Sequence, residues 1–162
     1  MNDEKGQLSG EYMLLVGSLI VVLMISIFMI TNENELNIAM AAAKSGADEG
    51  VASSSSAIYP KETFNEYDDM EGLKHPYSVS IVNVSYNSSG IDENYGKQKI
   101  QFKVYAKASA DYNKKELDSI GDRINYNLRK SVAMSFNTAD STNKLYNPVF
   151  SNNYVFTTAN VV

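Results

Sequence analysis

The sequence predicts an α+β protein in which a long N-terminal helix, apolar in its first half, precedes a small head of antiparallel strands packed on one helix. Three observations favour this class. An uncharged apolar run spans 13–30, and no proline follows it until Pro60. Apolar and polar residues alternate over 100–108, which is typical of a strand. Apolar residues then recur every three or four positions between 111 and 136, which indicates a second helix.

Length and composition limit the function classes. The chain has 162 residues, 44 % of them hydrophobic and 20 % charged, which suits one modest domain plus an extra element. Its formal net charge is −5, whereas a nucleic-acid binder needs a basic face, so we predict no nucleic-acid partner. With no cysteine, neither a disulfide nor a thiolate metal site can form.

The apolar run from Met13 to Ile30 is long enough to cross a bilayer. As a helix it rises about 27 Å, close to the hydrocarbon thickness. A single transmembrane anchor is one interpretation. A secretory signal peptide is another, but the preceding MNDEKG holds one lysine against two acids, and no A-x-A-like site follows Ile30.

Helix formers continue beyond the apolar run. We predict one continuous helix from about Leu8 to about Val51, in which Gly46 and Gly50 each lower helix stability by about 1 kcal/mol. Its second half is rich in small residues, which let helix backbones approach closely. These are Ala39, Ala41, Ala42, Ala43, Gly46 and Ala47. The interpretation is a bundle in which such helices from neighbouring copies of the chain pack side by side, and chance composition is the alternative.

The residues just before the apolar run are KGQLSGEY, from Lys5 to Tyr12. They place a carboxylate, Glu11, at the edge of the apolar helix. A carboxylate carried to the middle of a bilayer costs about 2.5–3.5 kcal/mol and less near the interface, so we expect Glu11 to have a partner. The positive end of the helix dipole favours it there, and a free α-amine would favour it further.

This segment resembles the processing motif Q-x-S-x-E-Y of archaeal type IV pilins with a class III signal peptide. All its fixed positions are present, as Gln7, Ser9, Glu11 and Tyr12, with Lys5 before them. The resemblance covers the leader and the apolar helix, roughly the first fifth of the chain. It implies that a prepilin peptidase cuts on the cytoplasmic side, between Gly6 and Gln7.

The resemblance also implies a function and a domain organisation. Residues 1–6 are the cleaved leader, 7–57 form a helix that spans the membrane and then joins a filament core, and 58–162 form the head. The precursor has a single span with its N-terminus in the cytoplasm. The mature chain is a structural pilin subunit that associates with its own copies in a helical cell-surface filament used for adhesion. Its other partners are the prepilin peptidase and the pilus assembly machinery.

In this family the carboxylate of Glu11 is expected to pair with the N-terminal amine of a neighbouring subunit, which exists only after the cut. Because an N-terminal glutamine can cyclise, Gln7 can also lose that amine charge, and Glu11 would then need a hydrogen-bond donor. The alternative function is a membrane-anchored extracellular binding module that is never cut and never polymerises.

In the head, the pattern predicts a strand over 77–86, a loop over 87–96 and a strand over 100–108, which together form an antiparallel pair. The second strand places Ile100, Phe102 and Val104 on one face. Gln101, Lys103, Tyr105 and Lys107 lie on the other face.

We predict a helix over 111–136, capped by Asp111 or Asn113. Its apolar stripe comprises Leu117, Ile120, Ile124, Leu128, Val132 and Phe136. Its solvated face carries Lys114, Lys115, Arg123, Arg129 and Lys130. Short strands over 145–150 and 154–158 complete the head.

No arrangement of residues indicates catalysis. A nucleophile–base pair and a phosphate-binding glycine loop are absent from the sequence, so we rank an anchored enzyme last. The acids at 62–71 lack the spacing of a calcium loop, and His75 is the only histidine. We therefore expect no enzyme activity, no cofactor and no metal site.

Two sequons occur, at Asn83 and Asn87, and become candidate N-glycosylation sites in a protein displayed outside the membrane. Asn87 lies in the predicted loop and is the better candidate. Asn83 lies in the predicted strand and must face solvent to be modified.

Overall fold

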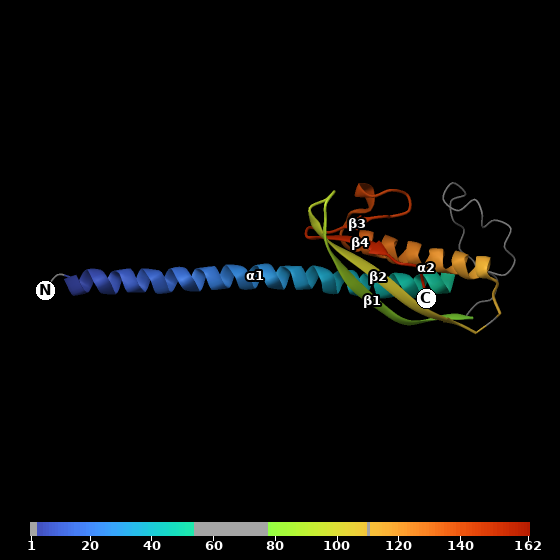
Figure 1. Ribbon diagram of the computed structural model, residues 1–162, viewed down its shortest axis with the longest axis horizontal. Coiled ribbons are helices and arrows are strands. Elements are labelled where there is room, and N and C mark those ends of the chain that lie inside the picture. The colour runs from blue at the N-terminus through green and yellow to red at the C-terminus, as the bar shows by residue number, and fades with distance from the viewer. Residues whose placement is uncertain (1–2, 54–77, 110) are drawn as a thin grey trace. The chain divides into compact units, whose positions relative to one another are not determined.

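The computed structural model describes residues 3–53, 78–109 and 111–162. Figure 1 shows the elements in chain order. They are α1 (Asp3–Ala52), β1 (Val79–Asp92), β2 (Lys97–Ala108), α2 (Lys114–Ser135), the 3-10 helix η4 (Ala139–Ser141), β3 (Val149–Phe150) and β4 (Tyr154–Thr158). The predicted α+β class is confirmed. The chain divides into two compact units, Met1–Leu36 and Asn37–Val162.

The first unit is the N-terminal part of α1. The helix begins at Asp3, earlier than the predicted start near Leu8, and ends at Ala52, one residue beyond the predicted end. Between Gly10 and Thr31 every side chain is exposed except Val16, which is half-buried. This segment therefore has no buried face within its own unit.

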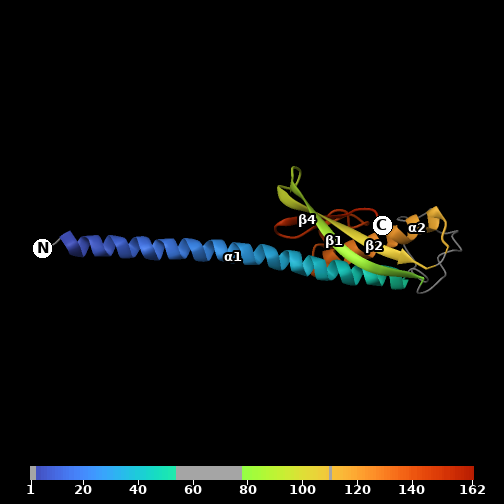
Figure 2. The same ribbon diagram turned by 60° about the horizontal axis from the view of Figure 1, so that its bottom comes forward.

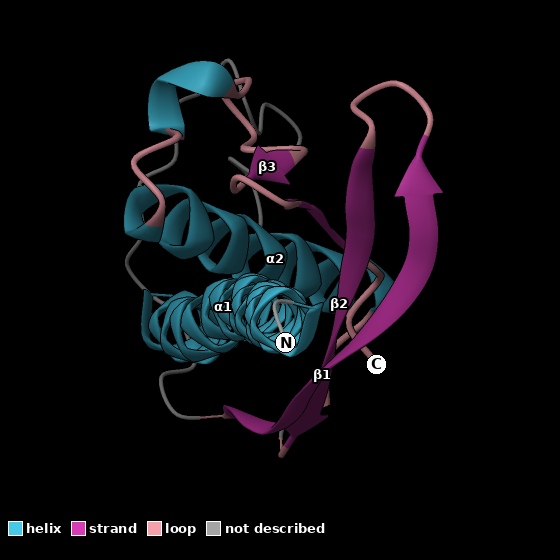
Figure 3. Ribbon diagram, turned by 90° about the vertical axis from the view of Figure 1, so that its left-hand side faces the viewer, coloured by secondary structure: helices cyan, strands magenta, loops and turns pink. Residues whose placement is uncertain are grey.

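In the second unit, the C-terminal part of α1 packs against α2, with both helices on one side of the sheet (Figure 3). A stripe at helical spacing is buried and consists of alanine and glycine alone. Its members are Ala39, Ala42, Ala43, Gly46, Ala47 and Gly50. Most of the small residues expected to pack between copies are thus buried within the chain, and Gly46 and Gly50 lie against its own α2, whereas Ala41 is exposed.

A capping box starts α2. The Asn113 side chain accepts a hydrogen bond from the backbone N–H of Glu116 at 2.9 Å, and the Glu116 carboxylate accepts one from the N–H of Asn113 at 2.9 Å. Asn113, one of the two expected caps, is therefore the cap. The expected apolar stripe is buried at Ile120, Ile124, Leu128 and Val132.

Three residues of α2 differ from the prediction. Leu117 was expected in the core but is 45 % exposed, because it lies in the first turn of the helix. Arg123 was expected on the solvated face but is only 8 % exposed. Arg129 was also expected there, yet its guanidinium donates to the carbonyl of Leu145 at 3.1 Å and to the hydroxyl of Thr158 at 2.5 Å. Burial lowers the pKa of Arg129, which the charges of Asp122 and Tyr126 partly oppose.

The sheet has four strands in the order β1-β2-β4-β3. β1 and β2 form a long antiparallel hairpin (Figure 2). β1 extends to Asp92 and the turn is short, so the predicted loop over 87–96 is wrong for 87–92. β4 runs parallel to β2, which corrects the expectation of antiparallel strands throughout. β3 is only two residues long, shorter than the predicted strand over 145–150.

The core lies between the sheet and the two helices. β2 contributes Ile100, Phe102 and Val104, none more than 1 % exposed, and β4 contributes Phe156. The rings of Phe102 and Phe156 stack with their centroids 5.6 Å apart. The C-terminal residues continue along β2, since the N–H of Ala106 donates to the carbonyl of Val162 at 2.8 Å.

Candidate functional site

The main candidate site is the apolar surface of α1 between Tyr12 and Ile30. Its exposed large apolar side chains range from 47 % exposed at Ile20 to 76 % at Met13, and they point to every side of the helix. An apolar surface of this extent marks a site that another molecule covers, either lipid or protein. By length and composition, α1 is long and apolar enough to cross a membrane.

The few polar side chains in this segment are compatible with an apolar environment. The hydroxyl of Ser18 donates to the carbonyl of Leu15 at 2.8 Å, and that of Ser26 donates to Val22 at 2.8 Å. The hydroxyl of Thr31 bonds to Ile27 in the same way at 2.9 Å. Because the helix satisfies these donors itself, they need no water when the segment is covered.

Glu11 is the exception. It is exposed, and it lies two residues before the apolar run. No lysine, arginine or histidine occurs between Gly10 and Leu36, so this segment contains no cation to pair with its carboxylate. Covering the helix therefore requires a donor for Glu11 from elsewhere.

The predicted cleavage site lies in the first turns of α1. The backbone of Lys5, Gly6, Gln7 and Ser9 is helical, but their side chains lie outside the described part of the chain. Of the predicted motif residues, Glu11 and Tyr12 have described side chains, and both are exposed. The structure thus places the motif immediately before the exposed apolar surface.

Both candidate glycosylation sites lie on β1. Asn83 pairs with Tyr105 and Asn87 with Gln101, so both asparagines are on the outer face of the sheet, and both are exposed. Asn87 is in a strand rather than the predicted loop. Both asparagine side chains are therefore accessible to solvent although they lie in a strand.

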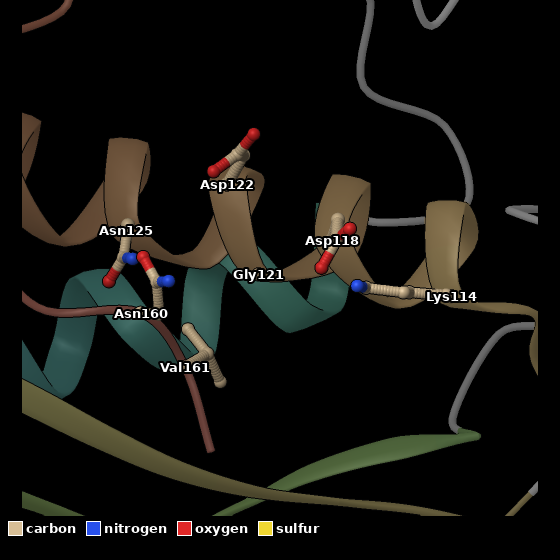
Figure 4. A pocket seen from close by; sticks show the side chains of 7 residues that line it. All are labelled: Lys114, Asp118, Gly121, Asp122, Asn125, Asn160 and Val161. Carbon is tan, nitrogen blue, oxygen red and sulfur yellow. The ribbon is translucent and has the colours of Figure 1, made fainter.

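The head also contains an open hollow of about 490 Å³ between the first half of α2 and the C-terminal residues (Figure 4). The side chains of Lys114 and Asp118 point toward each other there, whereas Asp122 points outward. The Asn125 amide donates to the carbonyl of Ala159 at 2.9 Å. Among the described residues no three His, Cys, Asp or Glu side chains gather to hold a metal ion. His75 and the acids at 62–71 lie outside those residues.

Sequence reasoning missed one surface. It placed Lys103 and Lys107 on the outer face of a strand but did not notice that Lys97 and Lys99 continue the same face. The signal was present in the sequence, since all four lysines occupy odd-numbered positions of one strand.

No known protein family, no curated protein and no solved structure matches this chain. Its function is therefore inferred from the leader residues and the exposed apolar helix.

Proposed function

We propose that this chain is a structural pilin subunit of an archaeal type IV pilus-like surface filament used for adhesion. A prepilin peptidase cuts it between Gly6 and Gln7, and the apolar helix then packs against the helices of other copies. The observation that carries the proposal is the apolar surface from Tyr12 to Ile30, exposed on every side and directly preceded by Glu11. The leader motif supports it.

The exposed surface explains why the chain needs a membrane before assembly. Burying one large apolar side chain is worth about 1.5–3 kcal/mol, so leaving this whole segment in water would cost on the order of 20 kcal/mol or more. Lipid covers it in the precursor and neighbouring helices cover it in the filament.

The move from lipid into a filament gains little hydrophobic free energy, because lipid tails are as apolar as leucine. Helix packing and the pairing of Glu11 must therefore favour assembly. The carboxylate of Glu11 needs a donor in an apolar environment, and the segment 10–36 supplies no cation. A new amine at Gln7 of a neighbouring copy meets that need only after the cut.

The N-terminal residue of protein sheared from the surface of its own cells tests the proposal. We expect Gln7, free or cyclised, at the N-terminus of filaments, measured by intact mass and N-terminal peptide sequencing. Full-length protein that stays monomeric in the membrane would contradict the proposal and support the anchored binding module.

Two substitutions separate processing from assembly. Gly6→Val should block the cut, because a branched side chain replaces glycine at the scissile bond. Glu11→Gln should be cut normally but should form few filaments or none, because it loses the charge that pairs with the amine.

Glu33→Gln is the matched control, since it makes the same charge change on an exposed residue of the same helix beyond the apolar run. It should assemble as the parent chain does. If Glu11→Gln and Glu33→Gln form filaments equally, the assigned role of Glu11 is wrong.

A further inference from the structure

The outer face of β2 carries a row of four lysines, Lys97, Lys99, Lys103 and Lys107, which we call the lysine row. Side chains alternate along a strand, and the buried residues Ile100, Phe102 and Val104 occupy the inner face. The odd-numbered lysines therefore point away from the core. In Figure 3, α2 and the C-terminal part of α1 lie together on one side of the β1–β2 hairpin.

Three of these lysines have no acidic neighbour across the sheet. Lys103 pairs with Ser85 and Lys107 with Ser80 on β1, and Lys99 lies beside Val155 on β4. The structure shows none of the three in an ion pair with a described residue.

Lys97 differs from the other three. Its ammonium donates to the carbonyl of Ser151 at 2.6 Å and lies 5.9 Å from the centre of the Phe150 ring. It also faces Asp92 across the hairpin. Among the described residues, the lysines of the row with neither an ion pair nor an acidic cross-strand neighbour are therefore Lys99, Lys103 and Lys107, in a chain whose formal net charge is −5.

The spacing of this positive face suits an extended polymer. Neighbours among Lys99, Lys103 and Lys107 are four residues apart, or about 13 Å along the strand. The row is therefore about 33 Å long from Lys97 to Lys107. An isolated anion would contact one lysine only, whereas a chain of regularly spaced anions contacts several at once and gains affinity through each additional contact.

We propose that the lysine row binds an extended anionic polysaccharide. The lysines pair with its carboxylate or sulfate groups, and the amides of Asn83 and Asn87 on the same face hydrogen-bond to its hydroxyls. Tyr105 offers a ring for a sugar to stack on, and the Lys103 ammonium lies 5.1 Å from the centre of that ring.

The same face is less suited to nucleic acid. Binding of single strands relies on successive bases stacking on several aromatic side chains. On β2 the outer face has one aromatic residue, Tyr105, while Phe102 is buried on the inner face. Charge complementarity with a polymer of sugars therefore explains the surface better.

The binding test uses the full chain in an uncharged detergent, so it does not depend on cleavage or polymerisation. The probes are polygalacturonate, neutral dextran of similar length and single-stranded poly-dT. We expect binding to polygalacturonate that weakens steadily as salt is added, and no binding to dextran. No binding to polygalacturonate, or tighter binding to poly-dT, would overturn the proposal.

The variant Lys99→Gln/Lys103→Gln/Lys107→Gln should bind polygalacturonate about ten-fold more weakly and with a shallower salt dependence. Its control is Lys44→Gln/Lys114→Gln/Lys115→Gln, which changes the net charge equally at exposed positions of α1 and α2. The control should lose less than about two-fold. Equal losses in the two variants would show that overall charge, and not the lysine row, determines binding.

A mass measurement of Asn83 and Asn87 in the protein purified from its own cells provides a second test, which does not require filaments. We expect a fraction of the chains to carry neither glycan. A glycan on either asparagine would cover part of the face that carries the lysine row and would obstruct the polysaccharide. Complete modification of either asparagine would contradict the proposal.

Discussion

Glycine at positions 46 and 50 lets the backbones of α1 and α2 approach more closely than any other residue would allow. A Cβ atom at Gly46 would lie 2.6 Å from the carbonyl oxygen of Asn127 and 2.8 Å from the Cα of Leu128. At Gly50 it would lie 2.7 Å from the Cα of Ile124. The obstacles are backbone atoms, which cannot move aside as a flexible side chain can. The two glycines weaken an isolated helix but permit the close packing of α1 on α2.

We predict that Gly46→Ala and Gly50→Ala each destabilise the head by about 1–3 kcal/mol, although alanine is the better helix former. The reason is the overlap with the backbone of α2. Chemical unfolding followed by circular dichroism measures the effect. Gly121→Ala is the control, because its Cβ would meet only the Val161 side chain, at 3.4 Å. The idea fails if Gly46→Ala stabilises the head as much as Gly121→Ala does.

The capping box gives a second prediction for a single residue. Asn113→Ala removes the hydrogen bond to the Glu116 N–H and leaves the first turn of α2 without its side-chain acceptor. We expect a loss of about 1 kcal/mol in the free energy of unfolding. Asn160→Ala, at an exposed position outside the helix, should change it by less than about 0.5 kcal/mol. Equal stability of the two variants would argue against the cap.

At the scale of the elements, local patterns predicted the buried inner face of β2 and the buried apolar stripe of α2. Burial repeats every 2 residues along a strand and every 3.6 residues along a helix, so both patterns are visible in the sequence. They failed at 87–92, where Asn, Ser and Gly favour a loop. There β1 continues because Gly90 has a φ of 83° beside a register shift, which lets the strand pair up to Asp92. The leader motif is equally local, so the candidate cleavage site could be found in the sequence.

The direction of β4 could not be predicted, because it depends on contacts between residues far apart in the chain. Phe156 stacks on Phe102 of β2 with centroids 5.6 Å apart and on Phe136 with centroids 5.7 Å apart. These contacts accompany parallel pairing of β4 with β2. No short sequence pattern predicts such contacts between residues that are distant in the sequence. The lysine row was missed for the opposite reason: the pattern was local, but the lack of acidic cross-strand neighbours at Lys99, Lys103 and Lys107 is a property of the sheet.

We predict that Phe156→Ala destabilises the head by about 3–5 kcal/mol, because Phe156 is 1 % exposed and links β2, β4 and the end of α2. Thermal unfolding measures the loss. Tyr86→Ala removes an aromatic ring that is 45 % exposed on β1, and it should lose about 1 kcal/mol or less. Similar losses in the two variants would mean that the Phe156 cluster is not central to the core.

At the scale of the whole molecule, the single helix α1 is divided between two compact units. The sequence predicted that the head begins at residue 58, a boundary that lies outside the described residues. In the structure the second unit begins at Asn37, so the last turns of α1 belong with the head. They contribute Ala39, Ala43 and Ala47, all fully buried. The part of α1 exposed on all sides is therefore the stretch from Gly10 to Thr31, where only Val16 is half-buried.

This division predicts how fragments behave. A fragment of residues 37–162 keeps the alanine and glycine stripe of α1 and lacks the apolar surface at Met13–Ile30. We expect it to be soluble and monomeric and to unfold cooperatively. A fragment of residues 54–162 loses the helix that covers Ile124 and Leu128, so their side chains would be exposed. Burying each is worth about 1.5–3 kcal/mol, which is a large share of the stability of a small domain.

Sedimentation, circular dichroism and hydrogen exchange compare the two fragments. We expect strong protection of α2 amides in residues 37–162 and weak protection in residues 54–162. Equal protection in both would show that the head folds without α1, as the boundary at residue 58 requires.

If residues 37–162 aggregate while the full chain in detergent does not, the head itself needs the segment before Asn37 to remain soluble. That segment would then do more than contact lipid or other copies. Loss of filaments with a stable, monomeric 37–162 head would place assembly in the segment that carries Glu11 and the exposed apolar run.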